Sequence, residues 1–242
     1  SVADAFEIFL DVRYVSRVYG LAKPTLLSQK HDWHYRTWNW SIARIGDLDM
    51  HATEIMLASL GFEINSLRPI FEPRAAHGLP LKPPYIAVAA GVGVMGELKL
   101  WPASCWSDAA TELARHGYMV VQVGGVEDPV VEGAVDARGR SLPETASILE
   151  GAAALLAVEG GMVHLAAAVG TPAVVLFGPT NKRALAYPWN QNLGNSICPP
   201  CWWGPNWIEQ ACSRALTSCL NHAGPIEAVH AVMRLAGGAA PR

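Results

Sequence analysis

From Tyr85 onward, short apolar runs alternate with stretches that have the periodicity of amphipathic helices. The runs have the length of buried strands and read YIAVAA, YMVVQVGG, ALLAV and PAVVLFG. The helical stretches between them are SDAATELARHG, SLPETASILEGA and GMVHLAAAVG, and Ser141 precedes the second as an N-cap, three residues before Glu144. Strands that alternate with helices predict an α/β fold with a parallel sheet covered on both faces.

Residues 1–82 have a different pattern, rich in aromatic and polar side chains. Only the stretch MHATEIMLASLG predicts an amphipathic helix, ending at Gly61. The tryptophans of HDWHYRTWNW either form a sugar-binding surface or pack beneath a loop. The proline-rich stretch PRAAHGLPLKPP then reads as a linker. We therefore expect a partial N-terminal domain and linker over residues 1–82 and a Rossmann-like domain over residues 83–242.

The composition limits the classes of function. The 242 residues carry a net charge of −3 without a basic tract, which argues against nucleic acid as a partner held by general electrostatics. No apolar run is long enough to span a bilayer, and the first residues lack the pattern of a secretory signal. We expect a cytoplasmic protein with a substantial hydrophobic core.

A candidate anion site lies in the segment EGGMVHLAAAVG, which joins the predicted strand ALLAV to the next helix. Ligands of open parallel sheets bind beyond the carboxyl ends of the strands. Gly160 and Gly161 lack side chains, so backbone amides there can approach an anion, which the helix dipole also favours. The motif predicts a phosphate or diphosphate site, and a tight turn is the alternative explanation of the two glycines.

Two further loops belong to the same predicted edge of the sheet. The loop GVGVMGELKLWP contains Lys99, which can reach a diphosphate as a point charge. The loop VGGVED contains Glu127 and Asp128, whose carboxylates can accept hydrogen bonds from ribose hydroxyls. Taken alone, each of these residues is better explained as a solvated loop side chain.

Taken together and in order, these motifs resemble glycosyltransferase family 9, the ADP-heptose-dependent heptosyltransferases. The resemblance extends from about Tyr85 to Met233 and includes KLWP, VVQVGG followed by ED, the block EGGMVHLAAAVGTPAVVLFGPT and a C-x-x-C pair. It implies the GT-B fold of two Rossmann-like domains. The donor-binding C-terminal domain is the one recognised here, preceded by an incomplete N-terminal domain.

The resemblance also implies roles for individual residues in binding the donor. These are Lys99 and the backbone of Gly160 and Gly161 for the phosphates, Glu127 or Asp128 near the nucleoside, Arg140 at the adenine pocket, and His164 on the helix that follows. Glu159 is also expected to bind the donor, and Glu159, Gly160 and Gly161 stand where the family usually has Asp, then Ser or Thr, then Gly. By residue type alone, His164 is better explained as a buried histidine, whereas the motif favours a contact with phosphate or sugar.

The catalytic base proposed for the family is an Asp in a Gly-Asp turn after the first strand. Gly46-Asp47 is the only Gly-Asp pair in this chain, but no predicted strand precedes it. Asp47 is therefore a weak candidate and is better explained as a residue that starts a helix. We expect a family member without its opening strands: a fragment, a trimmed product, a degenerate paralogue, or a chain whose missing half comes from a partner chain.

Four of the five cysteines lie close together, in an element over residues 197–220. Cys198, Cys201, Cys212 and Cys219 have the spacing C-x2-C-x10-C-x6-C, and four thiolates can surround zinc or iron tetrahedrally. The alternatives are two disulfides or free thiols, and the cytoplasmic expectation favours the metal. A site closed by four protein ligands would be structural.

The resemblance implies transfer of a heptose or similar sugar from an ADP-sugar to a lipopolysaccharide core or a protein hydroxyl, without a catalytic metal. It is compatible with peripheral association at the inner face of the membrane and with a homo-oligomer. The missing base favours an alternative: a non-catalytic nucleotide-sugar-binding or assembly subunit, or one part of a split transferase.

Overall fold

The computed structural model describes residues 51, 53–54, 66–93, 96–194, 200–201, 219–220 and 223–238. Several predictions fall outside these residues. They concern Asp47, the aromatic stretch HDWHYRTWNW, most of the helix expected at MHATEIMLASLG, and two of the four clustered cysteines, Cys198 and Cys212. The expected division of the chain at residue 82 also stays a prediction.

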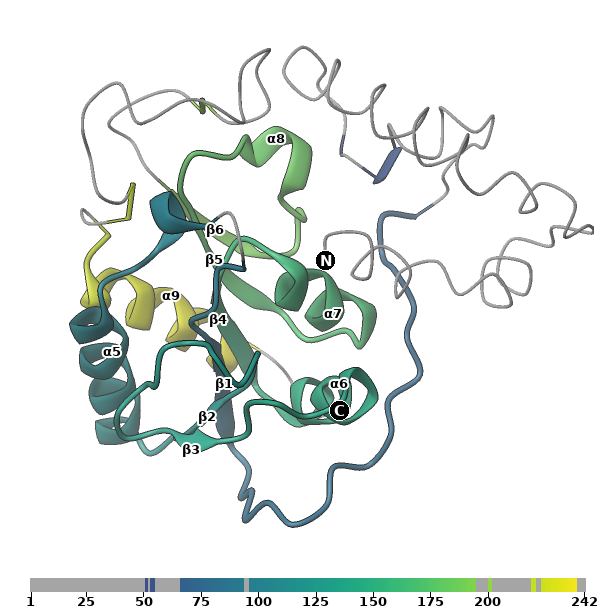
Figure 1. Cartoon of the computed structure of the whole chain (residues 1–242), viewed down its shortest axis with the longest axis vertical. Coiled ribbons are helices and arrows are strands. Elements are labelled where there is room, and N and C mark those ends of the chain that lie inside the picture. The colour runs from purple at the N-terminus through teal and green to yellow at the C-terminus, as the bar shows by residue number, and fades with distance from the viewer. Residues whose placement is uncertain are drawn as a thin grey trace, which may run out of the picture.

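The described residues contain a six-stranded, fully parallel sheet, as the sequence pattern predicts (Figure 1). The strand order across the sheet is β3-β2-β1-β4-β5-β6. The strands are β1 (Tyr85–Ala89), β2 (Met119–Gln122), β3 (Val135–Asp136), β4 (Ala154–Val158), β5 (Ala173–Phe177) and β6 (Gln191–Gly194). All residues of β1, β4 and β5 are buried, because both faces of the sheet are covered.

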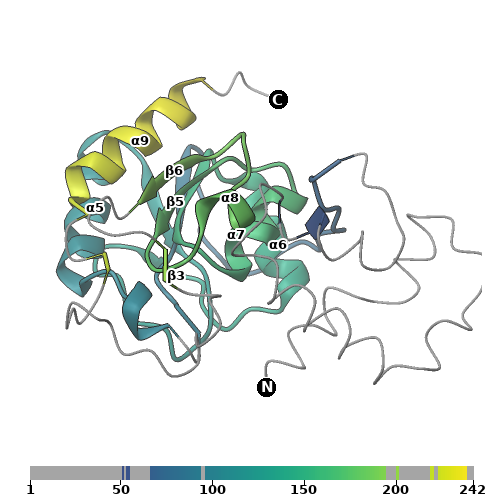
Figure 2. The same cartoon turned by 90° about the horizontal axis from the view of Figure 1, so that it is seen from above.

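The helices form one layer on each face of the sheet (Figures 1 and 2). They are α5 (Ala103–Arg115), α6 (Leu142–Gly151), α7 (Gly161–Ala168), α8 (Lys182–Leu185) and α9 (Pro225–Gly238), with a 3₁₀ turn, η2, at Glu97–Lys99. Helices α6 and α7 cover one face, and α5 and α9 cover the other. As predicted, Ser141 is the N-cap of α6, and its amide donates to the Glu144 carboxylate.

The stretch expected to be a linker packs along the face that α6 and α7 cover. Its partly buried apolar side chains there are Ala76, Leu79 and Leu81, and Leu67 and Phe71, which precede the stretch, pack against the same cluster. Arg74 adds a backbone hydrogen bond of 2.9 Å from its amide to the Pro143 carbonyl. This stretch is therefore fixed against the sheet layer over much of its length.

The strand order places a topological switch point between β1 and β4, the two central strands. The chain leaves β1 toward α5 on one face and leaves β4 toward α7 on the other. Such a divergence opens a crevice beyond the carboxyl ends of the two strands, where doubly wound folds bind ligands. No described helix is long and apolar enough to cross a membrane.

Candidate functional site

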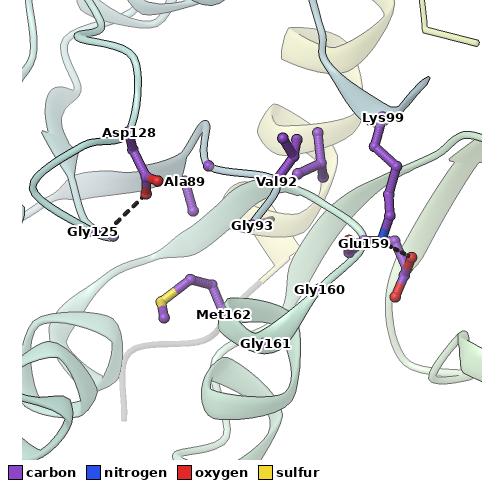
Figure 3. Close-up of a pocket in the computed structure, with 13 residues that line it drawn as sticks. Ala89, Val92, Gly93, Lys99, Gly125, Asp128, Glu159, Gly160, Gly161 and Met162 are labelled. Carbon is purple, nitrogen blue, oxygen red and sulfur yellow. Dashed lines mark hydrogen bonds and ion pairs between the residues drawn. The ribbon is translucent and has the colours of Figure 1, made fainter. Parts of the chain in front are cut away.

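A pocket of about 230 Å³ lies at this switch point (Figure 3). Its walls come from the carboxyl ends of β1, β2 and β4, from η2, and from the start of α7. The lining residues are Ala89, Gly91, Val92, Gly93, Lys99, Gly124, Gly125, Asp128, Val158, Glu159, Gly160, Gly161 and Met162. Five of the eight residues expected to bind a donor therefore meet in one pocket: Lys99, Asp128, Glu159, Gly160 and Gly161.

The start of α7 presents uncapped backbone amides to the pocket. Gly160 is the N-cap and offers no side chain to the amides of Gly161 and Met162, which precede the helical hydrogen-bond ladder, whereas the Val163 amide already donates to the Gly160 carbonyl at 3.1 Å. The Gly160 φ of 164° is extended backbone that other residues also adopt, and a Cβ added at Gly160 or Gly161 would meet no atom within 4 Å. Neither backbone strain nor packing requires these glycines. Their effect is open space before a helix N-terminus, which suits an anion.

A buried ion pair lies beside these glycines. The Lys99 ammonium donates to Glu159 Oε2 at 2.8 Å and to the Glu159 carbonyl at 3.1 Å (Figure 3). The Thr180 hydroxyl donates to the same Oε2 at 3.0 Å. Burial of a charge is costly unless it is paired and hydrogen-bonded, and this network meets that requirement for Glu159. The pairing fixes the cation at the edge of the pocket, next to the amides of α7.

Of the two candidate acids after β2, the structure places Asp128 in the pocket and leaves Glu127 exposed outside it. The Asp128 carboxylate accepts a 2.8 Å hydrogen bond from the Gly125 amide. It also lies tightly against Gly91 and Gly124, where any Cβ would collide with it. These glycines therefore let the Asp128 carboxylate lie across the ends of β1 and β2, where it can accept hydrogen bonds from ribose hydroxyls.

Arg138 holds this loop in place. Its guanidinium donates to the Asp128 carbonyl and, through two nitrogens, to the Asp136 carboxylate at 2.9 Å each. The hydrogen bonds from Arg138 lower the pKa of Asp136 to about 2. The Asp136–Arg138 pair thus ties the edge strand β3 to the loop that carries Asp128.

Arg140 and His164 do not line this pocket. Arg140 donates to the His77 carbonyl at 2.9 Å and lies 3.5 Å from the Glu144 carboxylate. It therefore connects α6 to the proline-rich stretch that precedes β1. His164 Nδ1 lies 2.8 Å from the Tyr187 hydroxyl, and burial lowers the pKa of its imidazole. The roles expected for both residues in donor binding stay predictions.

The described part of the chain holds two of the four clustered cysteines, and both lie against the loop that follows β5. The Cys201 amide donates to the Pro179 carbonyl at 3.0 Å, and a Cβ at Gly178 would lie 3.4 Å from the Cys219 Cβ. Residues eighteen positions apart are thus brought to one short loop, as a shared thiolate site requires. Within the described residues, no group of three or more side chains is arranged to hold a metal ion.

A comparison with protein families identifies the family of the chain. The sequence profile of glycosyltransferase family 9 (heptosyltransferase) matches residues 25–206, three quarters of the chain. The chain belongs to glycosyltransferase family 9. This confirms the resemblance drawn from the motifs around the pocket.

The sequence matches to two curated relatives cover only part of this chain and part of each relative. Lipopolysaccharide heptosyltransferase 1 of Pseudomonas aeruginosa is 35% identical over 116 residues, which are 43% of this chain and 32% of the relative. Lipooligosaccharide heptosyltransferase 2 of Haemophilus influenzae is 29% identical over 102 residues, 36% of this chain and 30% of the relative. The matched stretch thus spans about a third of the length of either curated relative.

Solved structures confirm the α/β fold of GT-B type. A family 9 glycosyltransferase of Veillonella parvula has a TM-score of 0.60 at 18% identity, over 81% of this chain and 63% of that one. The iron-containing dodecameric glycosyltransferase TibC of enterotoxigenic Escherichia coli has a TM-score of 0.63 at 20% identity, over 78% and 53% respectively. At these identities the likeness concerns the fold alone.

Sequence reasoning missed three contributors to the site. Thr180 supports Glu159 from the Gly-Pro-Thr turn after β5, and Arg138 fixes the Asp128 loop from an Asp-x-Arg sequence. Gly91 gives Asp128 room. A signal existed for each, since all three lie just beyond a strand at the edge where ligands bind.

Proposed function

We propose that this pocket binds the nucleoside diphosphate of an ADP-sugar, and that the chain acts in heptosyl transfer. One observation carries the proposal: uncapped amides of α7, the Lys99 ammonium and the Asp128 carboxylate line the same pocket at the switch point. The amides and the cation suit a diphosphate, and a carboxylate at a strand end suits ribose hydroxyls. Together, these groups match the diphosphate and the ribose of ADP.

The relatives support the choice of donor and reaction. The Pseudomonas relative is named as a lipopolysaccharide heptosyltransferase, and the Haemophilus relative as a lipooligosaccharide heptosyltransferase. TibC has been solved in complex with ADP-D-β-D-heptose. We take ADP-heptose as the donor and a hydroxyl of a lipopolysaccharide core or of a protein as the acceptor. Family membership favours this transferase over a non-catalytic binding subunit.

The proposed reaction is a substitution at the anomeric carbon of the heptose. The acceptor oxygen forms a bond to that carbon while the bond from the carbon to the β-phosphate oxygen breaks. The acceptor proton passes to a base, and ADP leaves with an additional negative charge. Lys99 and the amides at Gly160 and Gly161 would stabilise that charge, so this step requires no metal ion.

The first test of the proposal is the substitution Lys99→Ala. We expect the affinity for ADP to fall at least tenfold, about 1.4 kcal/mol, because the pocket loses its cation. Calorimetry with ADP measures the change, and adenosine, which lacks the diphosphate, should bind both proteins equally.

The matched control is Lys82→Ala, since Lys82 is exposed and precedes β1 at the opposite edge of the sheet. It should leave ADP affinity unchanged. Equal ADP affinity in wild type and Lys99→Ala would remove Lys99 from the binding site.

We also propose that Cys198, Cys201, Cys212 and Cys219 hold one structural zinc or iron ion. Cys201 and Cys219 each lie against the loop after β5, and the structural relative TibC contains iron. Elemental analysis of the purified chain should find about one zinc or iron per chain. Metal-free protein with four titratable thiols or two disulfides would contradict this proposal.

The remaining expectations concern location and assembly. We propose that the chain lies in the cytoplasm, with peripheral association at the inner face of the membrane. TibC is dodecameric, which supports a homo-oligomer. A partner chain that supplies the N-terminal half of a GT-B site is the alternative assembly. Size-exclusion chromatography with light scattering measures this assembly directly.

A further inference from the structure

A second cavity adjoins the pocket that we assign to ADP, the donor pocket. Its volume is about 270 Å³, and its walls come from the end of β5, the turn that follows it, the start of α8 and Pro200. Thr180 lines this second cavity, and its hydroxyl donates to Glu159, which lines the donor pocket. The two cavities therefore meet at the Thr180–Glu159 hydrogen bond, at the edge of the sheet where ligands bind.

The charged side chains of the second cavity are both cations. Lys182 and Arg183 line it, and none of the described residues in its lining carries a carboxylate. In the donor pocket, by contrast, Lys99 is paired with Glu159. A cleft lined by charge of one sign raises the local concentration of ligands of the opposite sign. The second cavity is therefore suited to an anionic group.

Lys182 is half-buried without a carboxylate partner. Its ammonium donates to the Asn192 carbonyl at 3.2 Å, and among the residues that the structure describes no acid lies within ion-pair distance of it. Burial lowers the pKa of this ammonium, and the charge of Glu227 on α9 opposes that effect. An ammonium has three N–H groups, so one carbonyl leaves it able to donate to an anion in the cavity that Lys182 lines.

Gly194, the last residue of β6, leaves room for the Lys182 side chain. Any Cβ at Gly194 would collide with the Cε and Nζ atoms of Lys182. The φ of Gly194 lies outside the left-handed region, so its backbone conformation does not require glycine. The effect of this glycine is therefore to let the ammonium lie against the end of the edge strand.

We propose that the second cavity binds an anionic group of the acceptor, a carboxylate or a phosphate on the sugar that receives the heptose. Lys182 donates to the anionic oxygens, and Arg183 adds a second positive charge. The junction at Thr180 brings this sugar next to the donor. The inference rests on the proposed transfer reaction, and it selects an acidic sugar over a protein hydroxyl as the acceptor.

The test measures the binding of small sugars to the chain saturated with ADP, so that the donor pocket is filled. The probes are glucuronate, glucose 6-phosphate and neutral glucose, each titrated by ligand-observed NMR. We expect both acidic probes to bind about fivefold more tightly than glucose or better, because only they form a charge-assisted hydrogen bond with the ammonium. Their affinity should fall as salt is added. The tighter of the two identifies the group as a carboxylate or a phosphate.

Two variants test the ammonium in different ways. Lys182→Gln removes its charge, whereas Gly194→Ala keeps the charge and displaces it, because the end of a flexible side chain moves more easily than backbone. Each should weaken the binding of the acidic probes about fivefold and leave ADP affinity unchanged. The matched control is Lys82→Gln, which makes the same change of charge at an exposed position before β1. It should bind ADP and the probes as wild type does.

Two outcomes with the ADP-saturated chain would overturn the inference. The first is equal affinity of wild type for glucose and for the acidic probes. The second is affinity for the acidic probes that Lys182→Gln leaves unchanged, since the anion would then lie elsewhere. Acidic probes that bind only in the absence of ADP would overturn this inference alone, because they would occupy the donor pocket. Failure of the wild-type chain to bind ADP would overturn the proposed function, and this inference with it.

Discussion

Gly161→Asp is expected to abolish ADP binding while leaving the fold at least as stable as wild type. A Cβ added at this position would meet no atom within 4 Å, so the substituted side chain starts in open space. Its carboxylate would occupy the space before the α7 N-terminus that we assign to phosphate. An acid in the first turn stabilises a helix by roughly 0.3–1 kcal/mol through the dipole, whereas it repels a diphosphate. We expect ADP affinity to fall at least about 100-fold, close to 3 kcal/mol.

Gly161→Asn separates charge from size, because the amide has nearly the same shape as the carboxylate. It should bind ADP more weakly than wild type and more tightly than Gly161→Asp. Calorimetry gives the affinities, and thermal unfolding gives the stabilities. An Asp variant that binds ADP within threefold of wild type would show that the phosphate lies elsewhere.

The sequence was sufficient to predict the centre of the sheet but not its edges. Strands β1, β4 and β5 are buried on both faces, so they read as continuous apolar runs, and the glycine pair after β4 marks the switch point. The edge strand β3 has two residues, and β6 reads QNLG with no buried residue. An edge strand forms because a neighbour supplies a ladder of hydrogen bonds, and no apolar pattern records that.

The helices show the same limit. Ser141 and Glu144 predicted the start of α6, because a capping box is a local signal. Helix α5 begins at Ala103, four residues before the predicted start, and Pro102 takes its N-cap position without a side-chain hydrogen bond. There the tertiary packing of Trp106 against Trp101 in the core takes the place of a local signal.

For the site, the sequence predicted which residues lie near the pocket but not which hydrogen-bond or ion-pair partners their side chains have. Lys99 and Glu159 were both expected at the pocket, and the structure pairs the side chain at the end of η2 with the side chain that follows β4. Arg140 reaches back to His77, 63 positions away, and His164 to Tyr187. A long polar side chain takes the partner that the tertiary structure brings within reach, so its sequence position alone does not decide its role.

The largest effect is expected in the transfer reaction itself. In the presence of ADP-heptose and a heptose-accepting core, the 242-residue chain should bind the donor but transfer it very slowly. The reason is that its sequence has no predicted strand followed by Gly-Asp, the element to which the family resemblance assigns the proposed base. General base catalysis contributes roughly 10²–10⁴-fold, so turnover should fall short of a family 9 heptosyltransferase that has this element by about that factor.

Asp47→Ala decides between the two roles considered for Asp47, a catalytic base and a residue that starts a helix. If Asp47 only starts a helix, the substitution leaves the residual rate and ADP affinity unchanged. Rapid transfer by the wild-type chain that Asp47→Ala abolishes would show that Asp47 is the base. Donor affinity must be measured beside the rate, because the contacts proposed to bind ADP, Lys99 and the α7 amides, do not include Asp47. Only a loss of rate at unchanged affinity identifies a group that acts on the acceptor proton.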